Sequence, residues 1–378
     1  MKILIAIDSF KGSLTSEEAG QAAQIAIQQT RPNIETEIIP IADGGEGMLS
    51  VMRKAIGGTM HTLLVHNPLM EIIPASYGIS SDRNTAFIEM ANASGLTLIP
   101  EEKRDPLKTT TYGTGELIRD ALENGCTEII IGIGGSATND AGIGMLQALG
   151  YRFLDKQGNA LGQGGEMMGE VVHIDISRKH RKLKNAHFIV ACDVQNPFYG
   201  PNGAAFVFAP QKGATPEMVY LLDQGLCSFA QVIFKETGKD ITNLPGSGAA
   251  GGLGGSLSAF LNADLQSGAD LLLGFSQFER KLENTQLILT GEGKIDRQSL
   301  MGKITGKILQ IGKEKHIPVI AIAGCVEDRE ELSRAGFKAI HQIKPGSMPL
   351  EKAMEPGIAM QNIQRTVSHL ITKWISSD

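Results

Sequence analysis

The sequence predicts an α/β fold in which a doubly wound parallel-sheet domain carries a second α/β domain as an insertion. Strand-like and helix-like segments alternate near both ends of the chain, which is typical of parallel α/β sheets. Between about residues 59 and 92 the helical periodicity disappears, and three segments of alternating polarity indicate antiparallel strands. At 378 residues, the chain is also long enough for two domains with separate cores.

The N-terminal segment supplies the first strand–loop–helix units. An Ile-rich run ends at Asp8, and Thr15-Ser16-Glu17-Glu18 has the pattern of a capping box that starts a helix. We therefore expect strands at 2–7 and 35–40 and helices at 16–29 and 48–56.

The later elements follow from the same periodicities. The predicted strands are 59–66, 71–79, 85–91, 128–131, 187–192, 286–289 and 318–323. The predicted helices are 115–124, 139–149, 303–313, 328–334 and 356–376. Because the two ends are alike, we expect 1–80 and 285–378 to form one discontinuous flavodoxin- or Rossmann-like domain. Residues 81–284 form the inserted domain in this prediction, with the active site in the cleft between the two.

Composition excludes several classes of protein. The net charge of −6 gives no general attraction to nucleic acid or to an anionic membrane, and no apolar run is long enough to span a bilayer. The four cysteines are far apart and include no C-x-x-C pair, which favours a reducing, cytoplasmic location. The eight histidines stand alone, so a zinc site is not expected. Composition leaves open whether the protein is a monomer or a homodimer.

Glycine is in excess, at 45 of 378 residues, and it clusters in short loops. One cluster, Gly132-Ile133-Gly134-Gly135-Ser136-Ala137-Thr138-Asn139-Asp140, follows a predicted strand and precedes a predicted helix. Free backbone N–H groups at such a junction bind phosphate, and the Ser136 and Thr138 hydroxyls add donors. A tight turn capped by Thr138 or Asn139 is the structural alternative.

The same loop has a second functional interpretation. Gly132-x-Gly134-x-x-Ala137 matches a dinucleotide fingerprint, and Asp155 follows at about the distance of the ribose-binding acid. An NAD-dependent oxidoreductase of a small hydroxy acid is therefore one possible class. A metabolite-binding protein without catalytic activity is a second, and a kinase, which would bind phosphate at this loop, is a third. Further anion-type loops favour a nucleoside triphosphate, although the chain has no Walker P-loop and no protein-kinase motif.

Carboxylates and lysines beside these loops are the candidates for phosphoryl-transfer chemistry. Asp43 and Glu46 lie in one glycine loop, with turn formation as the alternative role. Asp193 ends a predicted strand, and Lys294 lies between Glu292 and Asp296, an arrangement that also suits a surface salt bridge. The candidate cations facing substrate are, in order, Lys11 and Lys212.

Taken together, the loops resemble those of the bacterial glycerate kinase family of the first type. The motifs in chain order are Asp8-Ser9-Phe10-Lys11-Gly12-Ser13, Ala42-Asp43-Gly44-Gly45-Glu46-Gly47, Thr111-Tyr112-Gly113-Thr114-Gly115-Glu116, Gly134-Gly135-Ser136-Ala137-Thr138-Asn139-Asp140, Gly200-Pro201-Asn202-Gly203-Ala204-Ala205, Ala209-Pro210-Gln211-Lys212-Gly213-Ala214, Gly248-Ala249-Ala250-Gly251-Gly252-Leu253-Gly254 and Gly291-Glu292-Gly293-Lys294-Ile295-Asp296. The resemblance spans nearly the whole chain. It implies ATP-dependent phosphorylation of D-glycerate, usually to 2-phosphoglycerate, by a two-domain enzyme.

The expected roles combine this resemblance with local chemistry. We expect ATP to be bound by Gly134, Gly135, Ser136, Thr138, Asn139, Gly248, Gly251 and Lys294. Glu292, Asp296 and Glu46 are the expected Mg²⁺ ligands, to which Asp193 or Asp43 could contribute. Lys11, Asp43 and Asp193 are the expected catalytic residues, with Lys11 neutralising charge and Asp193 as the first choice for general base.

Overall fold

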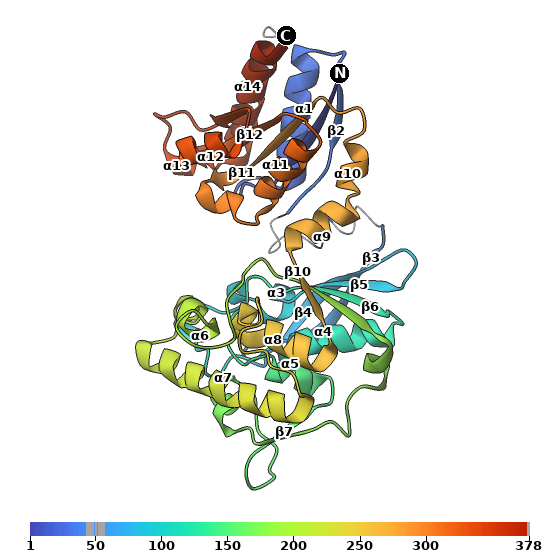
Figure 1. Cartoon of the computed structure of the whole chain (residues 1–378), viewed down its shortest axis with the longest axis vertical. Coiled ribbons are helices and arrows are strands. Elements are labelled where there is room, and N and C mark those ends of the chain that lie inside the picture. Colours follow the sequence, from blue (N-terminus) through green and yellow to red (C-terminus); the bar gives the residue numbers. More distant parts are fainter. Residues whose placement is uncertain (43–48, 50, 52–56, 376–378) are drawn as a thin grey trace. The chain divides into compact units, whose positions relative to one another are not determined.

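The computed structural model describes residues 1–42, 49, 51 and 57–375, and the chain divides into two compact units (Figure 1). The first unit combines 1–43 with 269–378, and the second is 44–268. This arrangement confirms the predicted α/β class with an inserted domain. The predicted boundaries, after 80 and before 285, differ from this division, because β3 (Thr59–His66) and β4 (Ile72–Ile79) pair within the sheet of the second unit.

The first unit is built on a five-stranded sheet in which every pair of neighbours is parallel. The order is β13-β12-β11-β1-β2, formed by β1 (Lys2–Ile7), β2 (Glu35–Ile38), β11 (Leu287–Ile295), β12 (Val319–Val326) and β13 (Ala339–Gln342). The chain runs outward from β1 to β2 on one side and from β11 to β13 on the other. The strand order therefore reverses between β1 and β11, and this is where open α/β sheets bind ligands.

Helices α1 (Ser16–Thr30) and α14 (Pro356–Ile375) lie side by side against this sheet, where they bury one apolar core (Figure 1). The capping box that predicts the start of α1 is present, because Thr15 and Glu18 exchange hydrogen bonds. The predicted helix at 48–56 falls largely outside the described residues. The other helices are α9 (Gly268–Phe275), α10 (Phe278–Lys281), α11 (Ile304–Glu314), α12 (Arg329–Ala335), α13 (Leu350–Ala353) and the 3₁₀ helix η6 (Arg297–Leu300).

The second unit contains a six-stranded sheet of order β10-β9-β6-β5-β4-β3. Besides β3 and β4, it comprises β5 (Thr85–Glu89), β6 (Glu128–Gly132), β9 (His187–Ala191) and β10 (Asp264–Gln266). The three predicted antiparallel segments are confirmed as β3, β4 and β5, whereas β5, β6, β9 and β10 pair in parallel. A small antiparallel pair, β7 (Arg152–Leu154) and β8 (His173–Asp175), lies apart from this sheet.

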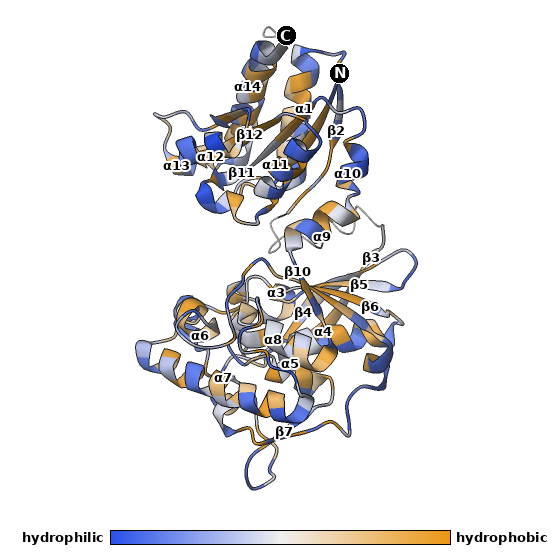
Figure 2. Ribbon diagram, in the orientation of Figure 1, coloured by the Kyte–Doolittle hydropathy of each residue, from blue (hydrophilic) through white to orange (hydrophobic). Residues whose placement is uncertain are grey.

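Helices pack around this sheet, and hydrophobic and polar residues alternate along α7 (Figure 2), whose buried residues include Leu222, Leu226 and Phe229. They are α3 (Ala91–Ser94), α4 (Tyr112–Glu123), α5 (Ile143–Ala148), α6 (Ala204–Phe208), α7 (Pro216–Thr237) and α8 (Ala249–Leu261). The 3₁₀ helices are η1 (Leu96–Leu98), η2 (Glu101–Lys103), η3 (Gly165–Glu170), η4 (Arg181–Asn185) and η5 (Pro210–Lys212). Over the described part of the chain, no helix has the length and apolar character needed to cross a membrane.

Two predicted elements are wrong at their boundaries. The segment 291–295, expected as a glycine loop, continues β11 and pairs with β12. A glycine is needed there, since a Cβ on Gly291 would lie 2.2 Å from the carbonyl oxygen of Ile322. Helix α5 begins at Ile143 rather than at 139, because Ala141 and Gly142 have positive φ values that end any continuous helix.

Candidate active site

A pocket of about 310 Å³ lies in the first unit at the strand-order reversal between β1 and β11. Its walls come from the loop after β1, the ends of β11 and β12, the segment after β13, the start of α11 and the helices α13 and α14. The charged residues that line it are Asp8, Lys11, Glu292, Lys294, Lys303 and Lys344. Four lysines and two carboxylates thus meet in one pocket of a chain whose net charge is negative.

The two carboxylates belong to adjacent strands. Ile7 is the register partner of Gly291, and the amide of Asp8 continues the ladder with a 2.8 Å hydrogen bond to the Gly291 carbonyl. Asp8 and Glu292 follow these two partners, so the pleat directs both side chains to the same face. Asp8 is 3% exposed and Glu292 is 8% exposed. Both carboxylates are therefore largely shielded from bulk water at the edge of the pocket.

Glu292 is oriented by the start of α11. The Thr305 hydroxyl donates to one carboxylate oxygen of Glu292 over 2.6 Å, and Nζ of Lys303 lies 3.8 Å from the other. A lysine at this distance attracts the carboxylate. The carboxylate can therefore serve as an acceptor or as a ligand of a hard cation.

Of the two predicted residues Lys294 and Asp296, only Lys294 lines the pocket. Nζ of Lys294 also lies 2.9 Å from Glu327 and 3.5 Å from Asp296. The hydrogen bond with Glu327 raises the pKa of Lys294. Asp296 does not line the pocket. Its side chain caps η6, where it accepts a 2.8 Å hydrogen bond from the Gln298 amide. Binding of one Mg²⁺ by Glu292 and Asp296 together stays a prediction.

Three charged residues of this pocket, Asp8, Lys303 and Lys344, are not among the site residues predicted from the sequence. Asp8 is predicted only as the end of a strand and as part of a family motif, and Lys303 only as the start of a helix. Asp8 has the same signal that identified Asp193, namely an acid directly after an apolar strand. Lys11, the predicted cation, lines the pocket. The next residue, Gly12, has a φ of +74°, and Ser13 beyond this turn lines the pocket as well.

The glycine loop at 133–142 belongs to the second unit and closes around a buried acid. Asp140 is fully buried and accepts hydrogen bonds from the Thr111 amide and hydroxyl, each over 2.8 Å. The amides of Gly142 and Gly144 donate to the same carboxylate over 3.1 Å. Burial raises the pKa of Asp140, while these donors act in the opposite direction. The acid therefore holds the loop together from within.

Lys212, the second predicted cation, is buried against this loop. Its Nζ donates over 2.7 Å to the Ser136 hydroxyl and over 2.7 Å to the Thr138 carbonyl. Burial lowers the pKa of Lys212 to about 7. The side chains of Thr138 and Asn139 are 0% exposed. The side chains predicted to hold ATP phosphates thus lie inside the second unit, where Ser136 is already engaged by Lys212.

The glycines predicted beside them serve close packing. Gly251 has a φ of +69°, and a Cβ there would lie 2.2 Å from the Thr138 carbonyl oxygen. A Cβ on Gly248 would lie 2.1 Å from the Pro197 carbonyl oxygen. Ala250, Gly251 and Gly252 are left-handed, so α8 contains a kink that fits against the loop. In the structure, the backbone of Gly251 therefore packs directly against the backbone of the 133–142 loop.

Asp193 lies just after β9, near the predicted strand end, and is exposed. Its carboxylate accepts from the amide of Gly268 over 2.9 Å and from the Ser267 hydroxyl over 3.3 Å. Gly268 is the last residue of the second unit. The two remaining predicted acids, Asp43 and Glu46, lie outside the described residues.

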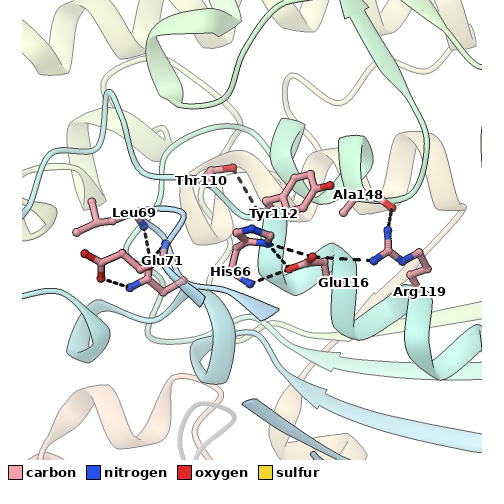
Figure 3. A network of polar contacts seen from close by, with 9 residues as sticks. His66, Leu69, Glu71, Thr110, Tyr112, Glu116, Arg119 and Ala148 are labelled. Carbon is pink, nitrogen blue, oxygen red and sulfur yellow. Dashed lines mark hydrogen bonds and ion pairs between the residues drawn. The ribbon is translucent and has the colours of Figure 1, made fainter. Parts of the chain in front are cut away.

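The motif at 111–116 joins α4 to the edge strand β3 (Figure 3). The Glu116 carboxylate accepts from the His66 amide over 2.8 Å and lies 3.0 Å from Nδ1 of the same residue. A Cβ on Gly113 would lie 1.9 Å from the His66 carbonyl oxygen, so the glycine permits this approach. Arg119 extends the network to the Ala148 carbonyl. The motif therefore has a packing role in the second unit.

The dinucleotide interpretation finds no support in this geometry. No helix begins at Ala137, since α5 starts only at Ile143. Asp155 accepts from the amides of Gln157 and Asn159 and so forms a local turn. Burial raises the pKa of Asp155, but the hydrogen bonds from Asn159 and Gln157 together outweigh it, so that this pKa is lowered. A ribose-binding acid is expected at the end of a second parallel strand. Asp155 instead follows β7, which pairs antiparallel with β8.

Comparisons with known proteins agree with the resemblance found in the sequence. The model of the glycerate kinase family matches residues 3–375. The glycerate 2-kinase of Escherichia coli K12 is 49% identical over 87% of this chain and 86% of its own length. The glycerate kinase of Bacillus subtilis 168 is 45% identical over 97% of this chain and 96% of its own length. A crystal structure of a protein assigned as glycerate kinase 2 of Salmonella typhimurium LT2 has a TM-score of 0.89 and is 43% identical, covering 100% of this chain and 99% of that one.

Proposed function

Because this chain belongs to the glycerate kinase family and is a glycerate kinase, we propose that it transfers the γ-phosphoryl group of ATP to D-glycerate with Mg²⁺. The proposed product is 2-phosphoglycerate. A relative that covers most of this chain at 49% identity is named glycerate 2-kinase, which favours the 2-hydroxyl as acceptor.

The pocket between β1 and β11 is the observation that supports this reaction best. Phosphoryl transfer is accelerated mainly by positioning and by neutralising charge on the transferring group. Lys11 and Lys303 line the same pocket as the buried carboxylates of Asp8 and Glu292. The lysines attract the anionic groups of both substrates, while the carboxylates prevent a surplus of positive charge before the substrates bind.

The donor set of the pocket also fits Mg²⁺. In the part of the chain that the structure describes, there is no group of three or more His, Cys, Asp or Glu that could hold a metal by itself. Mg²⁺ commonly binds through one or two carboxylates together with substrate phosphates. Asp8 and Glu292 would hold the ion, which would neutralise negative charge on the phosphates. Thr305 keeps one oxygen of Glu292 oriented for this role.

Acceptor activation requires a group that orients the glycerate hydroxyl and takes its proton. Asp193 stays our proposal for this general base. The support for it is an exposed carboxylate that follows a parallel strand and is held by the Gly268 amide. Lys11 is proposed to face either the transferring phosphoryl group or the glycerate carboxylate.

A coupled assay that follows ADP release tests the reaction directly. We expect release to require ATP, Mg²⁺ and D-glycerate together, and ³¹P NMR of the product to show 2-phosphoglycerate. Release with glycerate but formation of 3-phosphoglycerate would contradict only the position of transfer. No glycerate-dependent release of ADP would refute the proposed reaction, and turnover of NAD⁺ with a hydroxy acid would replace it with the alternative.

A further inference from the structure

The pocket of the first unit has an apolar side that the chemistry of glycerate does not require. Besides its charged groups, the pocket has an apolar lining, called here its apolar side, made of Phe10, Ile343, Leu350, Ala353, Met354 and Ala359. Leu350 is 64% exposed and Met354 is 37% exposed, although the neighbouring helix α14 buries Ile363, Val367 and Leu370. Exposed apolar groups that border a pocket, with charged groups beside them, are typical of ligand sites.

The two sides suit different parts of one ligand. Glycerate is a three-carbon acid with a hydroxyl on each remaining carbon, so it offers no apolar surface to Leu350 or Met354. A nucleotide offers both kinds of surface, since its base is flat and largely apolar and its phosphates are anionic. The four lysines of the pocket match the phosphates, and the apolar side matches the base.

We propose that this pocket is the nucleotide site, with the adenine of ATP against Leu350 and Met354 and its phosphates toward Lys11 and Lys303. This inference rests on the proposed function, because it assigns the place of that reaction's phosphoryl donor. It moves the nucleotide from the 133–142 loop, whose polar side chains are buried, to the point between β1 and β11 where the strand order reverses.

Position supports the assignment independently of polarity. The methyl group of Met354 lies 3.1 Å from where a Cβ on Gly12 would be, so α13 packs on the loop that carries Lys11. The apolar side and the β1 loop are therefore one continuous wall. A base bound on Met354 places its phosphates along that loop, next to the carboxylates of Asp8 and Glu292.

The first test replaces the apolar contact without changing charge. In Leu350→Gln, we expect the Kd of ADP measured by calorimetry to rise about 5-fold or more, because apolar area that the base would cover is lost. Binding of inorganic tripolyphosphate, which has no base, should not change. Leu64→Gln is the matched control, since Leu64 is 70% exposed and belongs to β3 in the other unit.

Other outcomes of this test overturn the assignment. An unchanged Kd for ADP in Leu350→Gln would mean that the base binds elsewhere, and a raised KM for D-glycerate alone would give the pocket to the acceptor. Equal weakening of ADP and tripolyphosphate would place phosphates, rather than the base, on this side. Because calorimetry needs no turnover, these outcomes are distinct from a failure of the kinase reaction itself.

A second test uses two half-buried cysteines as internal probes. Cys325 lines the pocket, whereas Cys227 lies on α7 in the second unit. We expect ADP to slow alkylation of Cys325 by iodoacetamide at least about 5-fold and to leave Cys227 unchanged, as measured by mass spectrometry. D-glycerate alone should protect neither cysteine. Protection of Cys325 by glycerate but not by ADP would overturn the proposal.

Discussion

Nζ of Lys212 donates to the Ser136 hydroxyl over 2.7 Å, deep inside the second unit. Ser136 lies in the glycine loop that the sequence suggests as a phosphate site, and Lys212 comes from η5, more than seventy residues further along the chain. The lysine also donates to the Thr138 carbonyl. A cation predicted to face substrate is therefore part of the internal support of the loop.

This burial predicts how stability depends on pH. The pKa of Lys212 is lowered to about 7 in the folded protein, from an ordinary value of 10.5. Between these values the unfolded chain binds more protons than the folded one, so the free energy of unfolding rises with pH on account of this residue. In Lys212→Met, which lacks the group, we expect a shallower rise from about pH 7 to pH 10, measured by urea unfolding.

The control for this experiment is Lys108→Met, since the Lys108 side chain is 70% exposed. This variant should keep the wild-type slope. If the Lys212→Met and wild-type curves ran parallel across the window, Lys212 would not be the buried titrating group that we describe.

Gly251 provides a prediction about packing. An alanine there would need a left-handed backbone and would put its Cβ 2.2 Å from the Thr138 carbonyl oxygen. We expect Gly251→Ala to lower the free energy of unfolding by about 3 kcal/mol or more, followed by circular dichroism in urea. Gly200→Ala is the matched control, because Gly200 also has a positive φ but has open space around its Cβ position. A cost of about 1 kcal/mol in both variants would show that backbone conformation, and not the contact with Thr138, decides the effect.

Local sequence patterns were enough to predict most of the framework. The strand at 59–66 and the helix at 16–29 agree with the structure to within one residue, because alternation and a capping box are local signals. The late start of α5 could not be predicted in this way. It depends on Asp140, which accepts a hydrogen bond from the amide of Thr111, a residue about thirty positions earlier in the chain. The hydrophobic periodicity within 139–149 gives no information about that contact.

The candidate site was predictable in part for the same reason. Lys11 and Glu292 were found because each follows an apolar strand in a glycine-containing motif. The sequence does not show that β1 and β11 become neighbours, since they are separated by the whole inserted unit. Asp8 acquires a partner acid only through that pairing. The roles of Ser136 and Lys212 likewise depend on a long-range contact that buries both.

Glu292 provides a test of the proposed metal site. Glu292→Gln keeps an oxygen that can accept from the Thr305 hydroxyl but removes the negative charge. We expect kcat to fall by about 100-fold or more and the apparent affinity for Mg²⁺ to weaken, because charge stabilisation in the transition state is lost. Glu327→Gln, which removes only the exposed partner of Lys294, should change kcat by no more than about 2-fold. Near-normal turnover of Glu292→Gln would exclude Glu292 from the metal site.

Asp193→Asn tests the proposed general base while preserving the local structure. Asparagine keeps an oxygen that can accept from the Gly268 amide, so the hydrogen bond at 2.9 Å is retained and only the basicity is lost. A positioned base contributes about 10²- to 10⁴-fold to rate, so we expect kcat to fall at least about 100-fold with little change in the KM values or in stability. Asp264→Asn is the control, since Asp264 is an exposed carboxylate in β10, the neighbouring strand. Turnover of Asp193→Asn close to wild type, with unchanged unfolding, would leave Asp193 only the structural role of holding Gly268, and the base would have to be sought among the other carboxylates.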